Sequence, residues 1–167
     1  MKVFLASDHA GLTLKEFIKN ELANSGHEVV DCGATLVDPN DDYPDFISRA
    51  AEKVSKDPEN SRGIIFGGSG QGEAMVANKF KGVRCALFYS KALAVEPINI
   101  EGDMSTDPFE ILILTREHNW ANMLSIGFRF VKQEDIFKAV EIWLNASDPK
   151  HERHKRRVEK IKKIENS

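Results

Sequence analysis

The chain is poor in cysteine and has no long apolar runs. Cys32 and Cys85 are the only cysteines among 167 residues, and their spacing matches no metal-binding pattern. A disulfide scaffold is therefore excluded, and both thiols are expected to be reduced and packed. No apolar run approaches the roughly 20 residues that span a bilayer, and the apolar start at Met1 meets Ser7-Asp8-His9 too early for a signal peptide. These absences predict a cytoplasmic protein with no membrane partner.

The net charge is also small, but it is unevenly distributed. The whole chain carries −3. Residues 150–167 hold eight basic and three acidic side chains, a balance of +5, so the preceding 149 residues carry −8. A basic tail can bind nucleic acid, but an acidic remainder argues against a broad nucleic-acid surface. The distribution favours a small anionic ligand or an acidic neighbouring subunit, and it predicts no nucleic-acid partner.

Two kinds of apolar segment alternate along the chain. Short apolar runs predict strands at 2–7, 27–31, 62–66, 83–88 and 122–131. Helical spacing predicts helices at 12–25, 44–56, 73–80, 133–145 and 152–165. Strands separated by helices imply a parallel sheet covered on both faces. The prediction is one α/β domain over residues 1–167, a Rossmann-like three-layer α-β-α sandwich with a five-stranded parallel sheet and an extended C-terminal helix.

The segment between residues 89 and 117 has the least regular pattern. Pro97 and Pro108 interrupt any helix there, so residues 96–108 are interpreted as an inserted loop. The apolar, partly β-branched run at 109–115 fits either a strand or a resumed helix.

A glycine-rich turn, Gly67-Gly68-Ser69-Gly70-Gln71-Gly72-Glu73, joins the third strand to a helix. It lacks the Lys of a P-loop, and its glycine spacing differs from the dinucleotide pattern. A tight turn with a carboxylate favouring the helix start is the simpler interpretation, but four glycines in six positions favour a ligand site. Backbone N–H groups beside a carboxylate suit proton abstraction next to a carbonyl, because the N–H groups stabilise the developing oxyanion.

Other polar residues are candidates for the same site. Asp8 and His9 follow the first strand, so they are expected at the same sheet edge as the glycine turn. His118 and Asn119 offer a proton shuttle and an amide donor. Two arginines spaced i, i+4 in the last helix share a face and suit a phosphate, and one more ends the fifth strand: Arg153, Arg157 and Arg129. Taken singly, each is as readily a capping or solvated surface residue.

In combination and order, these segments resemble the type B ribose-5-phosphate isomerase family, which includes galactose-6-phosphate isomerase subunits and allose-6-phosphate isomerases. The resemblance covers nearly the whole chain, apart from an apparent insertion around residues 90–112. The matching segments are Ser7-Asp8-His9-Ala10-Gly11, Asp42-Tyr43-Pro44-Asp45, the glycine turn, Ala77-Asn78-Lys79, Gly82-Val83-Arg84, Glu117-His118-Asn119, Ala121-Asn122, Gly127-Phe128-Arg129, Arg153-His154 and Arg157-Val158.

The resemblance implies an aldose–ketose isomerase that uses neither metal nor cofactor. Family members use a cysteine or a glutamate as base, and this chain has Gly67 at the cysteine position and Glu73 at the glutamate position. The implied catalytic residues are Glu73 for proton transfer, Asp8 and His118 for ring opening, and Ser69 nearby. The residues implied to bind the phosphate are His9, Arg129, Arg153 and Arg157, with His154 close by. Those implied to bind the enediolate are Asn119 and the turn residues Gly68, Gly70, Gln71 and Gly72. Tyr43 is also implied to contact the substrate.

The resemblance also implies a homodimer or homotetramer whose active sites use residues from two subunits. The expected reaction interconverts ribose 5-phosphate and ribulose 5-phosphate through a cis-enediolate. Two alternatives stay open at this point. One is an isomerase of allose 6-phosphate or galactose 6-phosphate. The other is a non-catalytic sugar-phosphate-binding subunit, motivated by the insertion and by Trp120, where the family commonly has Asp.

Overall fold

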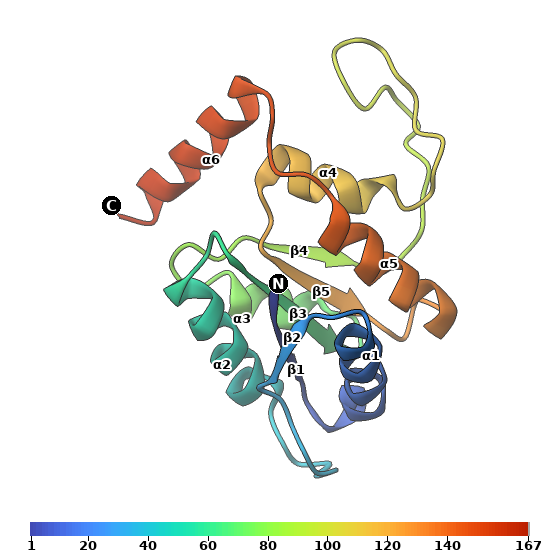
Figure 1. Ribbon diagram of the computed structural model, residues 1–167, viewed down its shortest axis with the longest axis vertical. Coiled ribbons are helices and arrows are strands. Elements are labelled where there is room, and N and C mark those ends of the chain that lie inside the picture. Colours follow the sequence, from blue (N-terminus) through green and yellow to red (C-terminus); the bar gives the residue numbers. More distant parts are fainter. Residues whose placement is uncertain (167) are drawn as a thin grey trace.

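The computed structural model describes residues 1–166, and its centre is a sheet of five parallel strands (Figure 1). The strand order is β2-β1-β3-β5-β4. The strands are β1 (Lys2–Ser7), β2 (Glu28–Asp31), β3 (Ser61–Gly67), β4 (Cys85–Phe88) and β5 (Met123–Gly127). The predicted number and direction of strands are confirmed.

Helices cover both faces of the sheet, which confirms the predicted three layers. The helices are α1 (Leu12–Asn24), α2 (Tyr43–Lys56), α3 (Gln71–Ala77), α4 (Glu110–Asn119), α5 (Gln133–Asn145) and α6 (Glu152–Ile164), with a short 3-10 turn, η1 (His9–Gly11), after β1. Alternate residues of β1 face opposite layers: Val3 and Leu5 pack with α1, α4 and α5, whereas Phe4 and Ala6 pack with α2 and α3. The last helix, α6, packs on α4 and extends past the sheet (Figure 1).

The structure differs from the sequence-based expectation in a few places. The ambiguous run at 109–115 belongs to α4, so it is helical. The fifth strand ends at Gly127 rather than at residue 131, because the chain turns there and the Phe130 N–H donates to the Gly127 carbonyl. The fourth strand begins at Cys85 rather than at residue 83, and α3 begins at Gln71, two residues earlier than predicted.

The strand order places a topological switch point between β1 and β3. From β1 the chain moves to one side to form β2, and it then crosses back to form β3 on the other side. Ligands of open α/β sheets bind at such a point, beyond the carboxyl ends of the strands. Asp8 and His9 follow β1 and the glycine turn follows β3, so both groups meet at this position, as predicted.

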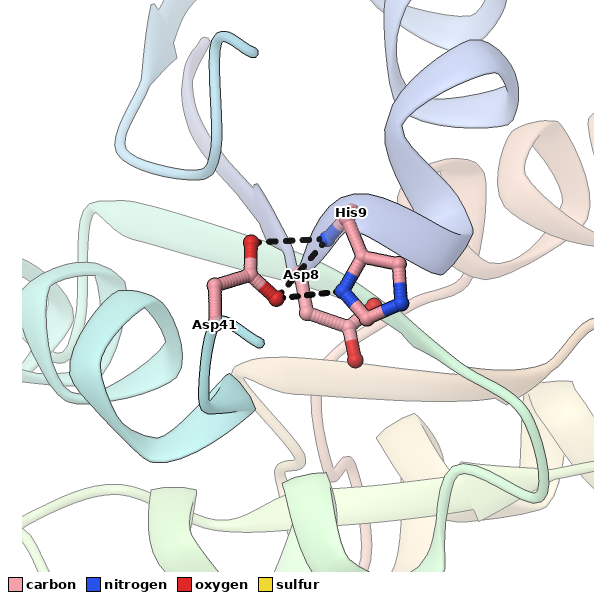
Figure 2. Close-up of side chains that lie close together, drawn as sticks. All are labelled: Asp8, His9 and Asp41. Atoms are coloured by element: carbon pink, nitrogen blue, oxygen red, sulfur yellow. Dashed lines mark hydrogen bonds and ion pairs between the residues drawn. The ribbon is translucent and has the colours of Figure 1, made fainter. Parts of the chain in front are cut away.

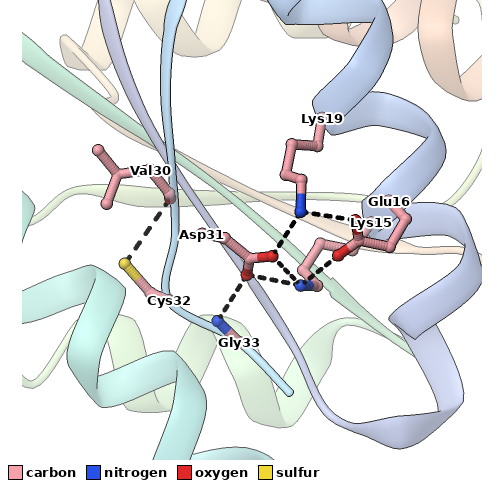
Figure 3. Close-up of polar contacts among 7 residues, drawn as sticks. All are labelled: Lys15, Glu16, Lys19, Val30, Asp31, Cys32 and Gly33. Atoms are coloured by element: carbon pink, nitrogen blue, oxygen red, sulfur yellow. Dashed lines mark hydrogen bonds and ion pairs between the residues drawn. The ribbon is translucent and has the colours of Figure 1, made fainter. Parts of the chain in front are cut away.

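A buried ion-pair cluster anchors the segment that leaves β2 (Figure 3). Lys15 in α1 is fully buried, and its Nζ lies 2.5 Å from the Asp31 carboxylate. The same carboxylate contacts Lys19 Nζ at 3.0 Å and accepts from the Gly33 N–H at 3.1 Å. Burial by itself raises the pKa of the Asp31 carboxyl, but these hydrogen bonds outweigh it and hold that pKa below its usual range. Asp31 therefore fixes the start of the loop between β2 and α2.

Replacing Asp31 with Asn leaves the Lys15 ammonium buried with only Glu16 as a partner, so we expect a loss of roughly 2–3 kcal/mol in unfolding free energy at neutral pH. Because the folded-state pKa of Asp31 is lowered, this stabilisation is present above the unfolded pKa and is lost as pH falls through the folded pKa. Urea denaturation of both proteins at neutral and acidic pH measures the difference. Glu52→Gln, which disturbs the exposed pair with Lys56, is the control and should leave the free energy of unfolding nearly unchanged.

Two further expectations concern the whole chain. Cys32 and Cys85 are free thiols, as expected, and burial raises the pKa of both, which makes them poor proton-transfer bases. Within the part of the chain that the structure describes, no helix is long and apolar enough to cross a membrane.

Candidate active site

The carboxylate of Glu73 lies against the backbone of Gly67. A Cβ built on Gly67 would lie 1.9 Å from the Glu73 carboxyl carbon, so the carboxylate occupies the space that a side chain at position 67 would need. Gly70 allows the turn that brings the two together, because its φ of +73° is a left-handed conformation that favours glycine. The structure therefore explains why a glycine at 67 accompanies a glutamate at 73: the two positions compete for one volume.

Glu73 is buried, with 6% of its surface exposed. Burial raises the pKa of its carboxyl, a hydrogen bond from its own backbone N–H lowers it, and the Asp8 carboxylate raises it again. The net shift is upward, so burial outweighs the hydrogen bond from the backbone N–H. A carboxylate with a raised pKa is a stronger base once ionised, and general acid–base catalysis requires such tuning.

Gly67→Ala tests the packing between these two residues. Its Cβ cannot share the space of the Glu73 carboxylate, so we expect displacement of that group and a fall of about 100-fold in kcat, the size associated with a misplacement of about 1 Å. Steady-state kinetics measures the effect. If Gly67→Ala acts through Glu73, adding it to Glu73→Gln should cost little further activity. A full additional loss in the double variant would contradict the explanation.

Four more of the predicted residues lie around the glycine turn. The Asp8 carboxylate accepts from the N–H groups of Ala10 and Gly11 and acts electrostatically on Glu73. The hydroxyl of Tyr43, in the first turn of α2, fills the space beside Gly72 where a side chain would begin, and the Arg129 guanidinium does the same beside Gly68. Ser69 is exposed on the turn, and its Oγ lies 3.4 Å from the Gln71 N–H.

His9 is held by a residue that the sequence analysis did not select. Figure 2 shows the Asp41 carboxylate between the backbone N–H and the ring of His9. The N–H donates at 3.0 Å to Oδ2, and Nδ1 lies 2.5 Å from Oδ1. Asp41 is one of four Asp or Asn residues within residues 38–42, and nothing in that run distinguishes it. Only the fold, which lays this loop beside the end of β1, identifies it.

Asp8, His9 and Asp41 each offer one metal-ligand atom, and these atoms lie within 4.8 Å of one another. The close contact between His9 Nδ1 and Asp41 already uses two of the atoms that a cation would need. That ion pair explains the proximity of His9 and Asp41, and the expectation of a metal-independent reaction stays a prediction.

The other predicted residues form a second group, at the end of α4 and in α6. The rings of His118 and His154 stack with centroids 4.1 Å apart, and the Arg153 Nε lies 3.0 Å from the His154 Nε2. Burial, and then the Arg153 guanidinium, lowers the pKa of His118, so this half-exposed imidazole is neutral at neutral pH and can accept a proton. His154 is buried and packs against the ring of His118, whereas Arg157 and Asn119 are exposed.

The two groups lie at opposite ends of the sheet. Asn119 ends α4 just before β5 begins at Met123, whereas Arg129 and the glycine turn lie beyond the carboxyl end of β5, at Gly127. The strand alone spans about 13 Å, at about 3.3 Å per residue. Figure 1 shows the same arrangement, with the end of α4 and α6 above the amino end of β5. Within one chain, His118 and Glu73 therefore cannot contact the same small molecule.

Trp120 belongs to the corner between α4 and β5 rather than to the glycine turn. It caps α4 in a left-handed conformation with φ of 53°. The Arg84 guanidinium lies 5.6 Å from the centroid of its ring, and the Lys162 ammonium lies 5.2 Å from the same centroid. This side chain connects the corner to α6, and it lies at the end of the sheet opposite Glu73.

Comparisons with known proteins give a consistent result. The family model described as Ribose/Galactose Isomerase matches residues 3–99 and 107–161. The interruption at 100–106 lies inside the segment expected as an insertion. A protein of Mycobacterium tuberculosis named ribose-5-phosphate isomerase B is 38% identical over 165 residues, covering 99% of this chain and 90% of its own.

Solved structures agree over the same length. The crystal structure of ribose-5-phosphate isomerase B from Mycoplasma genitalium, with bound ribulose 5-phosphate, superposes with a TM-score of 0.85 at 38% identity, covering 99% of this chain and 97% of that one. The enzyme of the same name from Clostridium thermocellum gives a TM-score of 0.82 at 34% identity, covering 99% and 98%.

Proposed function

The chain belongs to the ribose/galactose isomerase family, and on that premise we propose that it interconverts ribose 5-phosphate and ribulose 5-phosphate. It is an aldose–ketose isomerase, and its substrate is a phosphorylated sugar. The observation that carries the proposal is the buried Glu73 carboxylate in the space beside Gly67, at the start of α3 and next to Asp8. The similarity to a structure holding ribulose 5-phosphate favours this pair of sugars over the two 6-phosphohexoses.

We assign the proton transfer to Glu73. The ionised carboxylate removes the proton from C2 of the open-chain aldose and returns it to C1, with the cis-enediolate between the two steps. The proton of the O2 hydroxyl passes to O1, so that the aldehyde becomes the C1 hydroxyl and O2 becomes the ketone oxygen. The first turn of α3 has N–H groups without partners inside the helix, and these suit the developing oxyanion. Asp8 lies beside this position and, in our proposal, assists ring opening. Gly68, Ser69, Gly70, Gln71 and Gly72 form the turn around the substrate, and Tyr43 lies over Gly72.

The other half of the proposed site comes from a second copy of the chain. His118, Asn119, Arg153 and Arg157 lie at the far end of the sheet, too distant to reach Glu73 in one subunit. Two copies related by a two-fold axis would place each set opposite the other set of the partner. In this proposal His118 shares ring opening with Asp8, Asn119 joins the oxyanion donors, and the arginines bind phosphate together with His9 and Arg129. A homodimer is the smallest assembly that completes the site, and a cytoplasmic location stays a prediction.

An assay in D2O tests the reaction and its mechanism together. The purified protein should convert ribose 5-phosphate to ribulose 5-phosphate and place solvent deuterium at C1 of the product, because a carboxylate exchanges its proton with solvent during transfer. NMR detects both the product and the deuterium. Activity should survive dialysis against EDTA. Allose 6-phosphate and galactose 6-phosphate serve as competing substrates. Binding of all three sugars without turnover would support the non-catalytic alternative and overturn the proposal.

A further inference from the structure

The loop between β2 and α2, at the bottom of the view in Figure 1, reaches the candidate site through one side chain. Asp41 receives both the backbone N–H and the ring Nδ1 of His9, so its carboxylate fixes the position of that residue and the rotation of its ring. Only 10% of the Asp41 side chain is exposed, against 28% for His9. The pair is therefore shielded from solvent on the Asp41 side and open on the side of His9.

Hydrogen bonds within the loop hold Asp41 in place. Its N–H donates to the Asp38 carbonyl at 3.1 Å, and the Asn40 N–H donates to the Asp38 carboxylate at 2.9 Å. Upstream, the N–H groups of Cys32 and Ala34 donate to carbonyls of β1, which attaches the start of the loop to the same strand that His9 follows. The loop is thus fixed at both ends, and Asp41 is presented to His9 in one orientation.

The contact with Asp41 determines which ring nitrogen of His9 can donate to a ligand. Because Nδ1 faces Asp41, Nε2 is the nitrogen that points away, as Figure 2 shows. An imidazole bonded to a carboxylate through Nδ1 keeps a fixed orientation, and when it is protonated its Nε2–H is a charged donor. A charged donor suits a phosphate oxygen, and such charge-assisted hydrogen bonds are about twice as strong as neutral ones.

We propose that Asp41 is a positioning residue for the phosphate of the substrate: it orients the ring of His9 and maintains its Nε2–H as a charged donor. The proposal rests on the function proposed above, because it takes His9 to contact the sugar phosphate. Asp41 itself touches no substrate and acts only through His9.

The charges around His9 agree with this role. The hydrogen bond to Asp41 raises the pKa of His9, burial lowers it, and the carboxylates of Asp41, Asp8 and Asp38 raise it further. These three carboxylates come from the loop and from the end of β1. The net shift is upward, so the imidazole stays protonated to a higher pH than an ordinary histidine.

The test is Asp41→Asn, which keeps the shape of the side chain and removes its charge. We expect KM for ribose 5-phosphate to rise about tenfold near neutral pH with kcat changed less than about threefold, as for the loss of one charge-assisted hydrogen bond. The inhibition constant of inorganic phosphate should rise by a similar factor. Asp42→Asn is the matched control, since Asp42 is the exposed next residue and makes no side-chain capping bond; it should leave KM within about twofold.

The pH dependence separates positioning from a merely structural effect. His9 binds phosphate when protonated, so KM should rise as pH passes its pKa, and this rise should occur at lower pH in Asp41→Asn. The two proteins should therefore differ little in acid and most near neutral pH. A KM difference that is constant with pH would overturn the proposal.

A measurement on the unmodified protein keeps the proposal testable even if Asp41→Asn folds poorly. The histidine ring signals can be titrated by NMR, with the His9 signal assigned by its loss in His9→Gln. His9 should titrate above the ordinary value of about 6.5. Titration at or below that value would overturn the proposal, whatever the activity of the enzyme. Failure of the isomerase assay with a raised His9 titration would instead count against the proposed function.

Discussion

Glu73→Gln should lose about 1,000-fold in kcat, with little change in KM, because the amide can occupy the same space but cannot accept the proton. The space is defined by the structure: the carboxylate fills the volume beside Gly67, and Gln is nearly the same size as Glu. The phosphate-binding residues are untouched, so substrate affinity should persist. Kinetics with ribose 5-phosphate measures the loss, and unchanged activity would exclude Glu73 as the base.

The same substitution should not destabilise the protein. Because the folded-state pKa of Glu73 is raised above its unfolded value of about 4.3, its favourable contribution is complete below the unfolded pKa and is lost as pH rises through the folded pKa. At neutral pH the chain therefore bears the cost of an ionised buried carboxylate, which Gln removes. Urea denaturation should find Glu73→Gln at least as stable as the parent protein at neutral pH, and this advantage should disappear in acid.

Glu141→Gln is the control for this experiment. It makes the same chemical change at an exposed position of α5, so it should leave both kcat and stability unaltered. A loss of activity in Glu73→Gln that was accompanied by lower stability would indicate damage to the fold. A loss with equal or higher stability is the result that a buried base predicts.

The sequence was sufficient for the fold class because its apolar periodicity changes clearly between strands and helices. The run at 109–115 was ambiguous because it is both apolar and β-branched, and only packing of Phe109 and Leu112 into the core decides for a helix. The order of β4 and β5 in the sheet was also beyond the sequence, since both strands are short and apolar and either could pair with β3.

The candidate site was predictable as a set of residues but not as an arrangement. Glu73 is recognisable from its place after four glycines, whereas the direction of its pKa shift depends on burial, which spacing does not give. Asp41 could not be chosen among its acidic neighbours, because its role depends on a contact across 32 residues of sequence. The sequence grouped His118 with Glu73 by chemistry and by the family resemblance. Within one chain the parallel sheet separates them, because His118 adjoins the amino end of β5 and Glu73 its carboxyl end.

Because His118 and Glu73 lie at opposite ends of the sheet in one chain, mixing two inactive variants should restore activity. Glu73→Gln and His118→Asn should each be nearly inactive alone. If each site takes Glu73 from one subunit and His118 from the other, a mixed dimer contains one site with both substitutions and one site with neither. Random re-association after unfolding and refolding together makes half of the dimers mixed, so about a quarter of the sites should be intact, and about a quarter of the parent activity should return.

The control for this mixing experiment is a pair of variants from the same end of the sheet. Asp8 and Glu73 both lie at the carboxyl edge in one chain, so mixing Asp8→Asn with Glu73→Gln puts a substitution into every site of every dimer. That mixture should stay inactive, although its proteins have been refolded and paired in the same way. Recovery in the first mixture and not in the second requires a site built from opposite ends of two chains. Recovery in neither would mean that Glu73 and His118 do not serve one site across a dimer.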